Sequence, residues 1–150
     1  MGLKKEVSRV IANGSEQQLQ ELVEQHAGAV RHLLALTYQA DSVVRERAAH
    51  GVALAGHHHP RLVRRVIERL LWAMNDESGT NAQTAPLVLR AIARETPQLL
   101  ETAVPELNRA AQEDENIGGL ARQVLQELGR VPEIAGQWPE IFTGLQEAEE

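Results

Sequence analysis

The chain has 150 residues, of which 43% are hydrophobic but only 3% aromatic, and its formal net charge is −6 at pH 7. Alanine and leucine dominate the hydrophobic residues, which favours an all-α fold over a β-sandwich built from branched and aromatic side chains. The absence of cysteine excludes a disulfide framework, a thiolate nucleophile and cysteine-ligated zinc or iron–sulfur sites. A chain of this length buries roughly 70% of its unfolded surface, which predicts one domain.

The chain begins with a charged segment, residues 1–7, that lacks the apolar core of a secretory signal peptide. No run approaches the roughly 18 apolar residues that a membrane-spanning helix needs, so we expect a cytoplasmic protein that does not enter a membrane. Residues 43–69 hold six arginines against two glutamates, whereas residues 101–150 hold eleven acidic residues against three arginines. The sequence thus predicts a basic middle and an acidic C-terminal third.

Prolines and capping residues divide the chain into helices. Proline suits the first turn of a helix, where its missing N–H would have no partner, so each proline is expected to mark a helix start. Asp41 and Ser42 offer N-cap acceptors, and Gly56 is expected to end the same helix by adopting a positive φ. That helix is apolar on more than one face, which predicts an inner position covered from both sides. The predicted helices cover residues 3–12, 15–25, 29–38, 42–55, 60–74, 85–95, 97–102, 105–113, 119–128 and 139–147.

A repeat of 34 to 37 residues organises these helices. The string His59-Pro60-Arg61-Leu62-Val63 recurs as Thr96-Pro97-Gln98-Leu99-Leu100 and again as Val131-Pro132-Glu133-Ile134-Ala135. Such a period indicates stacked helical hairpins, that is, an α-solenoid of about ten helices in a single domain, residues 1–150. We divide it into an N-terminal cap of about residues 1–14 and repeats of about residues 15–40, 41–79, 84–115 and 117–150.

Two strings resemble a known family. Residues 41–56 resemble the first helix of a HEAT-like repeat of the phycobilisome-lyase type, which typically reads Asp-x-x-Val-Arg-x-x-Ala-x-x-Ala-Leu-x-x-Leu-Gly. The string Leu71-Trp72-Ala73-Met74-Asn75-Asp76-Glu77-Ser78-Gly79, followed by Ala85-Pro86, is similar to a motif of small bacterial and archaeal HEAT-repeat proteins of unassigned function. Where that family tends to have Gly and Trp, this chain has Thr-Asn-Ala-Gln-Thr at residues 80–84. The resemblance covers roughly residues 41–130 and implies an α-solenoid that binds a partner; it implies no reaction.

The segment after Trp72 is the most distinctive of the chain. Residues 76–84 contain no apolar side chain larger than alanine, so we expect a solvent-facing loop. Asp76 and Glu77 beside Ser78 offer a base and a nucleophile, but a triad also needs an orienting group and an oxyanion site, and this loop holds no histidine. We therefore assign no catalytic residue. In the structural alternative, Asn75 ends a helix and Asp76 or Ser78 bonds backbone N–H groups in a turn.

The run His57-His58-His59, with His50 upstream, is the obvious candidate for a metal site. A zinc site needs three or four ligands that converge on one point, and consecutive residues in a turn rarely supply more than one or two. Spacings such as His-x3-His are absent. We therefore predict a polar turn that ends at Pro60, with no metal and no cofactor.

Arginines and one tryptophan mark the outer side of the predicted helix 60–74. At 100° per residue, Arg61, Arg65 and Arg69 form one stripe with Arg64 beside them, and Trp72 falls among these arginines. The opposite side gathers the predicted core residues Leu62, Val63, Val66, Ile67, Leu70 and Met74. Arginine and tryptophan can stack on each other as a structural feature, but an exposed tryptophan among arginines is also the composition of a protein-binding hot spot.

These observations leave two hypotheses. The first is a non-enzymatic helical-repeat adaptor or scaffold that binds a protein or peptide, for which an acidic partner is the natural match, through the segment 72–84 and the neighbouring arginines. Its predicted binding residues are Trp72, Asn75, Asp76, Glu77, Ser78, Arg61, Arg65 and Arg69. The second is an enzyme or lyase-like accessory factor that handles a small molecule at residues 75–79. Nucleic acid is disfavoured, because the acidic C-terminal third repels phosphate. The sequence leaves the oligomeric state open.

Overall fold

The computed structural model describes residues 2–75, 80–113 and 117–149, and in these ranges the protein is all-α, without a strand. The predicted all-α class is therefore confirmed, and the α-solenoid arrangement stays a prediction. No helix in the described ranges is long and apolar enough to cross a membrane. The elements are α1 (Leu3–Asn13), α2 (Glu16–Gln25), α3 (Ala29–Leu36), α4 (Ser42–Ala55), α5 (Pro60–Asn75), α6 (Thr80–Glu95), the 3₁₀ helix η1 (Pro97–Ala103), α7 (Val104–Glu113), α8 (Gly118–Leu128), α9 (Pro132–Ala135) and α10 (Pro139–Glu149).

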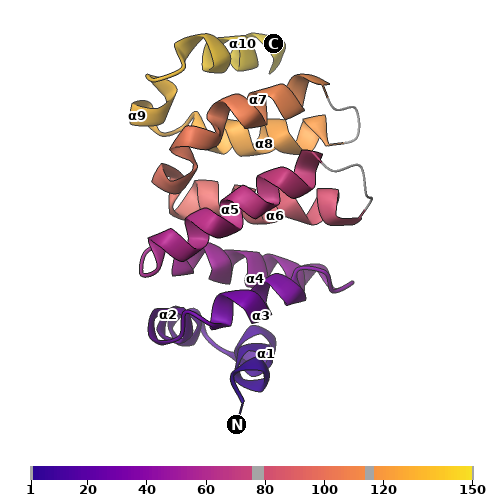
Figure 1. The fold of residues 1–150 in the computed structure, drawn as a ribbon, viewed down its shortest axis with the longest axis vertical. Helices are drawn as coiled ribbons and strands as arrows, with labels where there is room; N and C mark the ends of the chain where they lie inside the picture. The colour runs from indigo at the N-terminus through magenta and orange to yellow at the C-terminus, as the bar shows by residue number, and fades with distance from the viewer. Residues whose placement is uncertain (1, 76–79, 114–116, 150) are drawn as a thin grey trace.

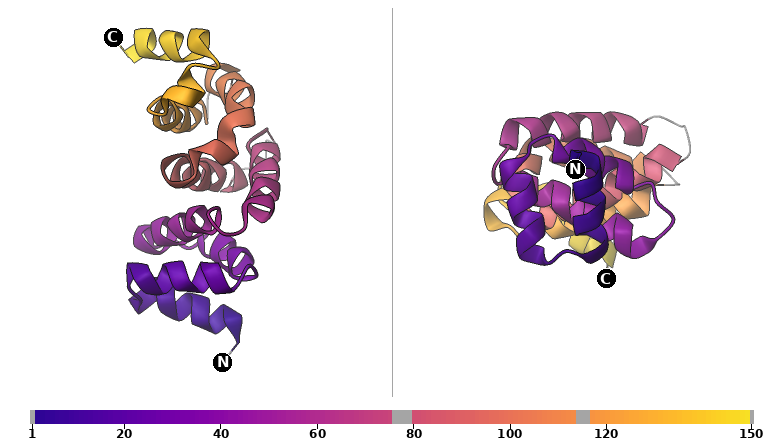
Figure 2. Two further views of the ribbon diagram at one scale, coloured as in Figure 1. Left: turned by 90° about the vertical axis from the view of Figure 1, so that its left-hand side faces the viewer. Right: turned by 90° about the horizontal axis from the view of Figure 1, so that it is seen from below.

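The helices follow one another along the long axis of the molecule, and the two termini lie at opposite ends (Figure 1). In the same view α3, α5 and α7 lie in front of α4, α6 and α8, and each front helix packs closely on the helix that follows it. Behind them, α4 packs against α6 and α6 against α8, and the side view in Figure 2 shows the same order from end to end. The boundaries of the repeats stay a prediction, because each helix of the rear row can be paired into a hairpin either with the front helix before it or with the front helix after it.

Side-chain caps and prolines begin several helices, as the sequence predicts. The Ser15 hydroxyl accepts a hydrogen bond from the N–H of Gln18, and the Gln18 side chain accepts one from the N–H of Ser15, which forms a capping box at α2. The Asp41 carboxylate accepts from the N–H of Val43, at 2.8 Å, at the start of α4. Pro60 opens α5, and prolines likewise open η1, α9 and α10.

The start of α6 differs from its prediction. The helix begins at Thr80 instead of residue 85, and Pro86 lies inside it. A polar segment predicts solvent exposure but does not distinguish a loop from the first turns of a helix, which is why the predicted loop 76–84 was too long. Between α5 and α6 there remain residues 76–79, and a connection of four residues is usual between packed helices.

The inner position predicted for the helix after Asp41 is confirmed. Every residue of α4 from Ala48 to Ala55 except His50 is buried, and α4 packs against α2, α3 and α6. Arg47 ties the same helix to α1, because its guanidinium donates to the carbonyls of Gly14, at 2.7 Å, and Val10, at 3.2 Å. Carbonyls at a helix C-terminus lack partners inside the helix, so this arginine satisfies part of that end.

Gly56 ends α4 for a different reason from the one predicted. Its φ is −60°, which any residue adopts, so the expected positive φ is wrong. The constraint is space, because a Cβ at this position would lie 2.8 Å from Thr96 Oγ1 and 2.9 Å from Leu99 Cδ1. A glycine here lets the end of α4 approach the start of η1.

We expect Gly56→Ala to lower the free energy of unfolding by about 1–3 kcal/mol, because Thr96 and Leu99 must move to admit the methyl group. Gly119→Ala is the matched control: Gly119 lies in α8 with nothing within 4 Å of an added Cβ, so alanine should raise the free energy of unfolding by up to about 1 kcal/mol. Urea denaturation measures both. Equal effects of the two substitutions would contradict the close approach at Gly56.

Candidate functional site

Helix α5 carries two different faces. Its buried residues are Val63, Val66, Ile67 and Met74, at 0% to 4% exposure, and Leu62 and Leu70 are half-buried beside them. Arg61, Arg65 and Arg69 lie exposed, one turn apart. Trp72 is 71% exposed, so it lies outside the core, as its helical position predicts. The remaining predicted binding residues, Asp76, Glu77 and Ser78, and the side chain of Asn75 lie outside the described residues.

The three arginines of α5 face a fourth arginine across a hollow. This hollow of about 840 Å³ lies between α3 and α5, with Arg31 and Leu34 on the α3 side and the arginine stripe on the α5 side. His58, His59 and Pro60 lie at the end where α5 begins. We call it the basic groove, defined by Arg31, Arg61, Arg65 and Arg69. The arginines thus line the walls of a concave surface that the sequence alone did not predict.

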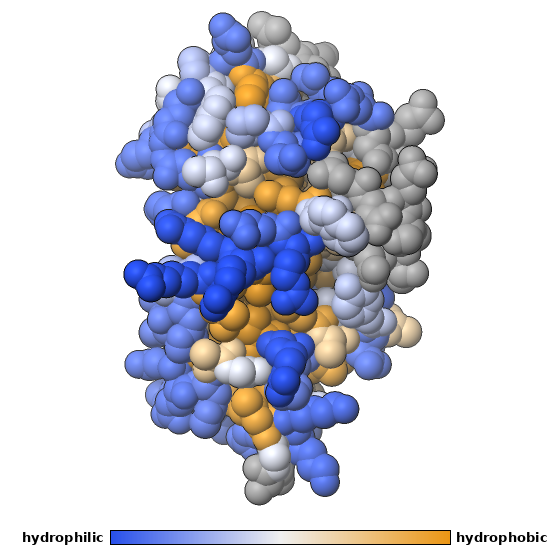
Figure 3. All heavy atoms as spheres, in the orientation of Figure 1, coloured by the Kyte–Doolittle hydropathy of each residue, from blue (hydrophilic) through white to orange (hydrophobic). Residues whose placement is uncertain are grey.

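A second hollow continues the basic groove toward the end of α5. It has a volume of about 410 Å³ and shares Leu34, Val66 and Arg69 with the basic groove. Trp72 and Tyr38, which is 52% exposed, both line it. These two and Val43 are the exposed large hydrophobic residues of the described part of the chain. Figure 3 shows the face formed by α3, α5 and α7, where strongly hydrophilic side chains lie over an apolar strip in the middle.

The arginines of the basic groove have no partner in the described part of the chain, whereas most other arginines do. Arg9 donates to Glu6, and this hydrogen bond lowers the pKa of the Glu6 carboxyl. Arg109 pairs with Glu106. No ion pair or hydrogen bond joins Arg31, Arg61, Arg65 or Arg69 to any described residue; Arg64 and Arg122, which lie outside the groove, likewise have none. Among the described residues, no carboxylate therefore pairs with the arginines of the groove.

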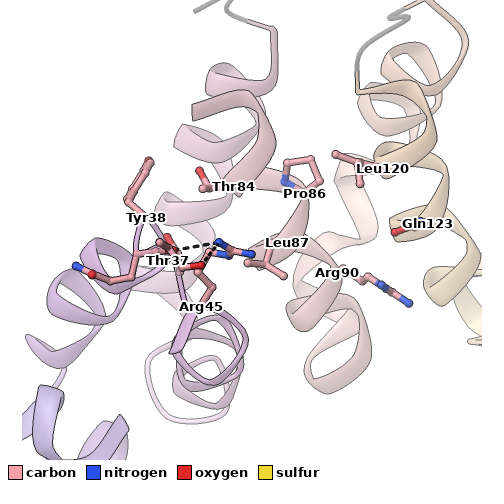
Figure 4. A pocket seen from close by; sticks show the side chains of 11 residues that line it. Thr37, Tyr38, Arg45, Thr84, Pro86, Leu87, Arg90, Leu120 and Gln123 are labelled. Atoms are coloured by element: carbon pink, nitrogen blue, oxygen red, sulfur yellow. Dashed lines mark hydrogen bonds between the residues drawn. The ribbon is translucent and has the colours of Figure 1, made fainter. Parts of the chain in front are cut away.

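A third hollow, of about 450 Å³, lies between the α3–α4 turn, α6 and α8 (Figure 4). Arg45 donates to the carbonyls of Gln39, at 3.1 Å, and Ala40, at 3.0 Å, so its guanidinium is already engaged. Arg90 points away from Arg45 in Figure 4, and its Nε lies 3.8 Å from Glu127. The two cations do not converge, and none of the described residues that line this hollow carries a carboxylate or an imidazole.

Two imidazoles of the histidine run, those of His57 and His59, contact separate partners. The His57 ring lies 3.0 Å from a Glu95 oxygen, and the His59 ring donates from Nε2 to the Val23 carbonyl at 2.8 Å. Upstream, His50 lies 2.7 Å from Glu16. Among the described residues, no group of three or more His, Asp or Glu side chains is placed to hold a metal ion.

Comparison with known proteins found no matching family model, no significantly similar curated protein and no significantly similar solved structure. The resemblance to HEAT-like repeats therefore stays a prediction.

Sequence reasoning missed Arg31 and Tyr38. Neither belongs to the predicted α5 stripe; Arg31 lies in α3, and Tyr38 follows the end of that helix. They reach the site because α3 lies beside α5 in the fold (Figure 1). Along the chain, Arg31 and Arg61 are 30 residues apart. A stripe plotted on one helix cannot show which side chain of another helix stands opposite.

A buried carboxylate should matter more for stability than any exposed ion pair of this protein. Glu127 is 8% exposed, accepts from Arg94 at 3.0 Å, and lies near Arg90 and Arg130. We expect Glu127→Gln to lower the free energy of unfolding by about 1–2 kcal/mol, toward the low end because all three arginines are exposed enough to rehydrate. Glu106→Gln, in an exposed pair, should change it by at most about 0.5 kcal/mol. Thermal melting of both variants measures this, and equal shifts would count against the network.

Removing metal should leave the protein unchanged, since the histidines bind separate protein partners. We expect the same melting temperature before and after EDTA treatment. A fall of several degrees that added zinc reverses would overturn this prediction.

Proposed function

We propose that the protein is a non-enzymatic adaptor or scaffold, an α-solenoid of HEAT-like hairpins that binds an acidic protein or peptide partner. Its proposed contact surface comprises Trp72, Arg61, Arg65 and Arg69 together with the segment 72–84. A cytoplasmic location belongs to the same proposal.

The observation that carries this proposal is an exposed Trp72 beside arginines that have no carboxylate partner among the described residues. Tryptophan and arginine are the residues most enriched at binding hot spots, because a large apolar ring or a planar cation gains most when a partner removes it from water. The α5 stripe also places like charges at i, i+4, which destabilises a helix by about 0.2–0.5 kcal/mol per pair. An acidic partner would relieve that repulsion.

The test is Trp72→Ala. Because this side chain is exposed, its loss should change the melting temperature by no more than about 2 °C, while binding should weaken about 30-fold if the ring is an anchor. Immobilised protein is exposed to a native lysate, captured proteins are quantified by mass spectrometry, and the strongest is titrated against each variant. The combined Arg61→Ala, Arg65→Ala, Arg69→Ala variant should lose the same acidic partners.

Val43→Ala is the matched control, because Val43 is also an exposed apolar residue, at 61%, but lines neither hollow of α5. It should retain every partner. The double variant Asp76→Ala, Glu77→Ala reports separately on the predicted residues of the α5–α6 connection. If Trp72→Ala unfolds the protein, or captures the same proteins as Val43→Ala, the surface is structural and the proposal is wrong.

A further inference from the structure

We propose that the basic groove receives one amphipathic α-helix of the partner, acidic along both sides of its apolar stripe. This inference rests on the proposed function and names the partner's structure and the residues that receive it. It also adds Arg31, on α3, to the binding surface.

The groove has the length of a short helix. Its lining runs along α5 from Pro60 to Ala73 through the two adjoining hollows. At 1.5 Å per residue this distance is about 20 Å, which corresponds to roughly three to four helical turns of a ligand. Trp72 and Tyr38 lie at one end, where they can enclose a large apolar side chain.

The chemistry across the groove fits an amphipathic helix. The residues between the arginine walls are aliphatic, with Val30 and Val66 buried and Leu34 and Leu62 half-buried. Arg31 stands on one side of this strip, and the α5 arginines stand on the other. A helix with an apolar stripe flanked by glutamates would place its stripe on the strip and a carboxylate row against each wall. The α5 arginines repeat every four residues, about 6 Å, the same spacing as glutamates at i, i+4 on a ligand helix.

The same lining disfavours an extended peptide. Side-chain acceptors are few along the basic groove: none of its described lining residues is Asn, Gln, Ser or Thr, arginine can only donate hydrogen bonds, and His58 and His59 lie at one end. The adjoining hollow adds the hydroxyl-bearing residues Thr37, Tyr38 and Thr84. An extended chain pressed on the strip would therefore find acceptors for only some of its backbone N–H groups, whereas a helix satisfies its backbone internally.

The packing of the front helices leaves a place for this ligand. α3 packs on α1, and α5 packs on α7, but α3 and α5 approach each other less closely than either of these pairs. The ligand helix would lie over the seam where a closer contact is missing. Nucleic acid fits this seam less well, because aliphatic side chains neither donate hydrogen bonds to phosphates and riboses nor stack on bases.

The test uses designed peptide probes and the full chain. The first probe is a fluorescein-labelled peptide of about 16 residues with leucines at i, i+3, i+4 and i+7 flanked by glutamates. The first comparator is a peptide with the same numbers of Leu and Glu in alternating order and one added central proline. The second is a single-stranded oligonucleotide. We expect saturable binding of the helical probe by fluorescence anisotropy, weakening as salt rises, together with a gain of helical circular dichroism in the probe.

The deciding variants are Arg31→Glu and Arg65→Glu, each expected to weaken the helical probe about tenfold or more. Arg64→Glu is the matched control, with the same change of charge on the same helix but outside the groove, and it should weaken binding less than about threefold. All three arginines are exposed, so no variant should unfold, and the relief of like charge in Arg65→Glu should shift the melting temperature by no more than about 4 °C. No saturable binding of the helical probe, equal binding of the alternating peptide or the oligonucleotide, or an equal effect of Arg64→Glu overturns the inference.

Failure of this inference differs from failure of the proposed function. If captured acidic partners depend on Trp72 and Arg65 but are indifferent to Arg31→Glu and to competition by the helical probe, the groove hypothesis is wrong and the adaptor stands. If no captured partner depends on Trp72 or the α5 arginines, the proposed function is wrong, whatever the probe does.

Discussion

Close packing around α4 sets the positions of the helices on both sides of it. A Cβ on Gly51 would come within 3.0 Å of Leu33 Cδ1 and 3.2 Å of Leu19 Cδ1, so α2 and α3 reach their positions because this residue has no side chain. On its other side α4 packs against α6. Since α3 rests on α4, and α5 rests on α6, the contact of α4 with α6 sets the separation of α3 and α5. The separation of α3 and α5 at the basic groove thus depends on two helices, α4 and α6, that do not line it.

The arginines of this protein divide into two kinds according to what their guanidinium groups meet. Arg47 satisfies carbonyls at the end of α1, and Arg94 holds the buried Glu127 of α8, so both join helices that are distant in the chain. Arg31 and the α5 stripe join nothing within the described residues. Four unpaired like charges along one groove do not stabilise a stack of helices. Residues that lower the stability of the fold in this way are expected at functional surfaces.

Much of the fold followed from local signals that act within one turn of the chain. The Asp41 cap, the prolines that open α5 and α10, and the core stripe of α5 were predictable because each depends on neighbours in sequence. The start of α6 was misjudged from local sequence, but two other errors came from effects beyond that range. The steric limit at Gly56 is set by Thr96 and Leu99, some 40 residues away, and Arg31 enters the site only because α3 lies beside α5. The sequence therefore predicted one wall of the groove and could not predict the other.

Charge in this molecule also bears on how a partner would approach. The net charge is −6, and residues 101–150 alone hold eleven acidic residues against three arginines, so an acidic partner would be repelled by the C-terminal third and attracted to the α3–α5 face. At physiological salt such fields extend only about 8 Å, which confines the attraction to the groove and its rim. Charge would then orient the encounter, while the aliphatic strip and Trp72 would supply the contacts that hold a bound partner. An acidic segment without an apolar stripe would be attracted to the groove but would make few contacts with the aliphatic strip. The groove should therefore select partners by their hydrophobic pattern more than by their charge.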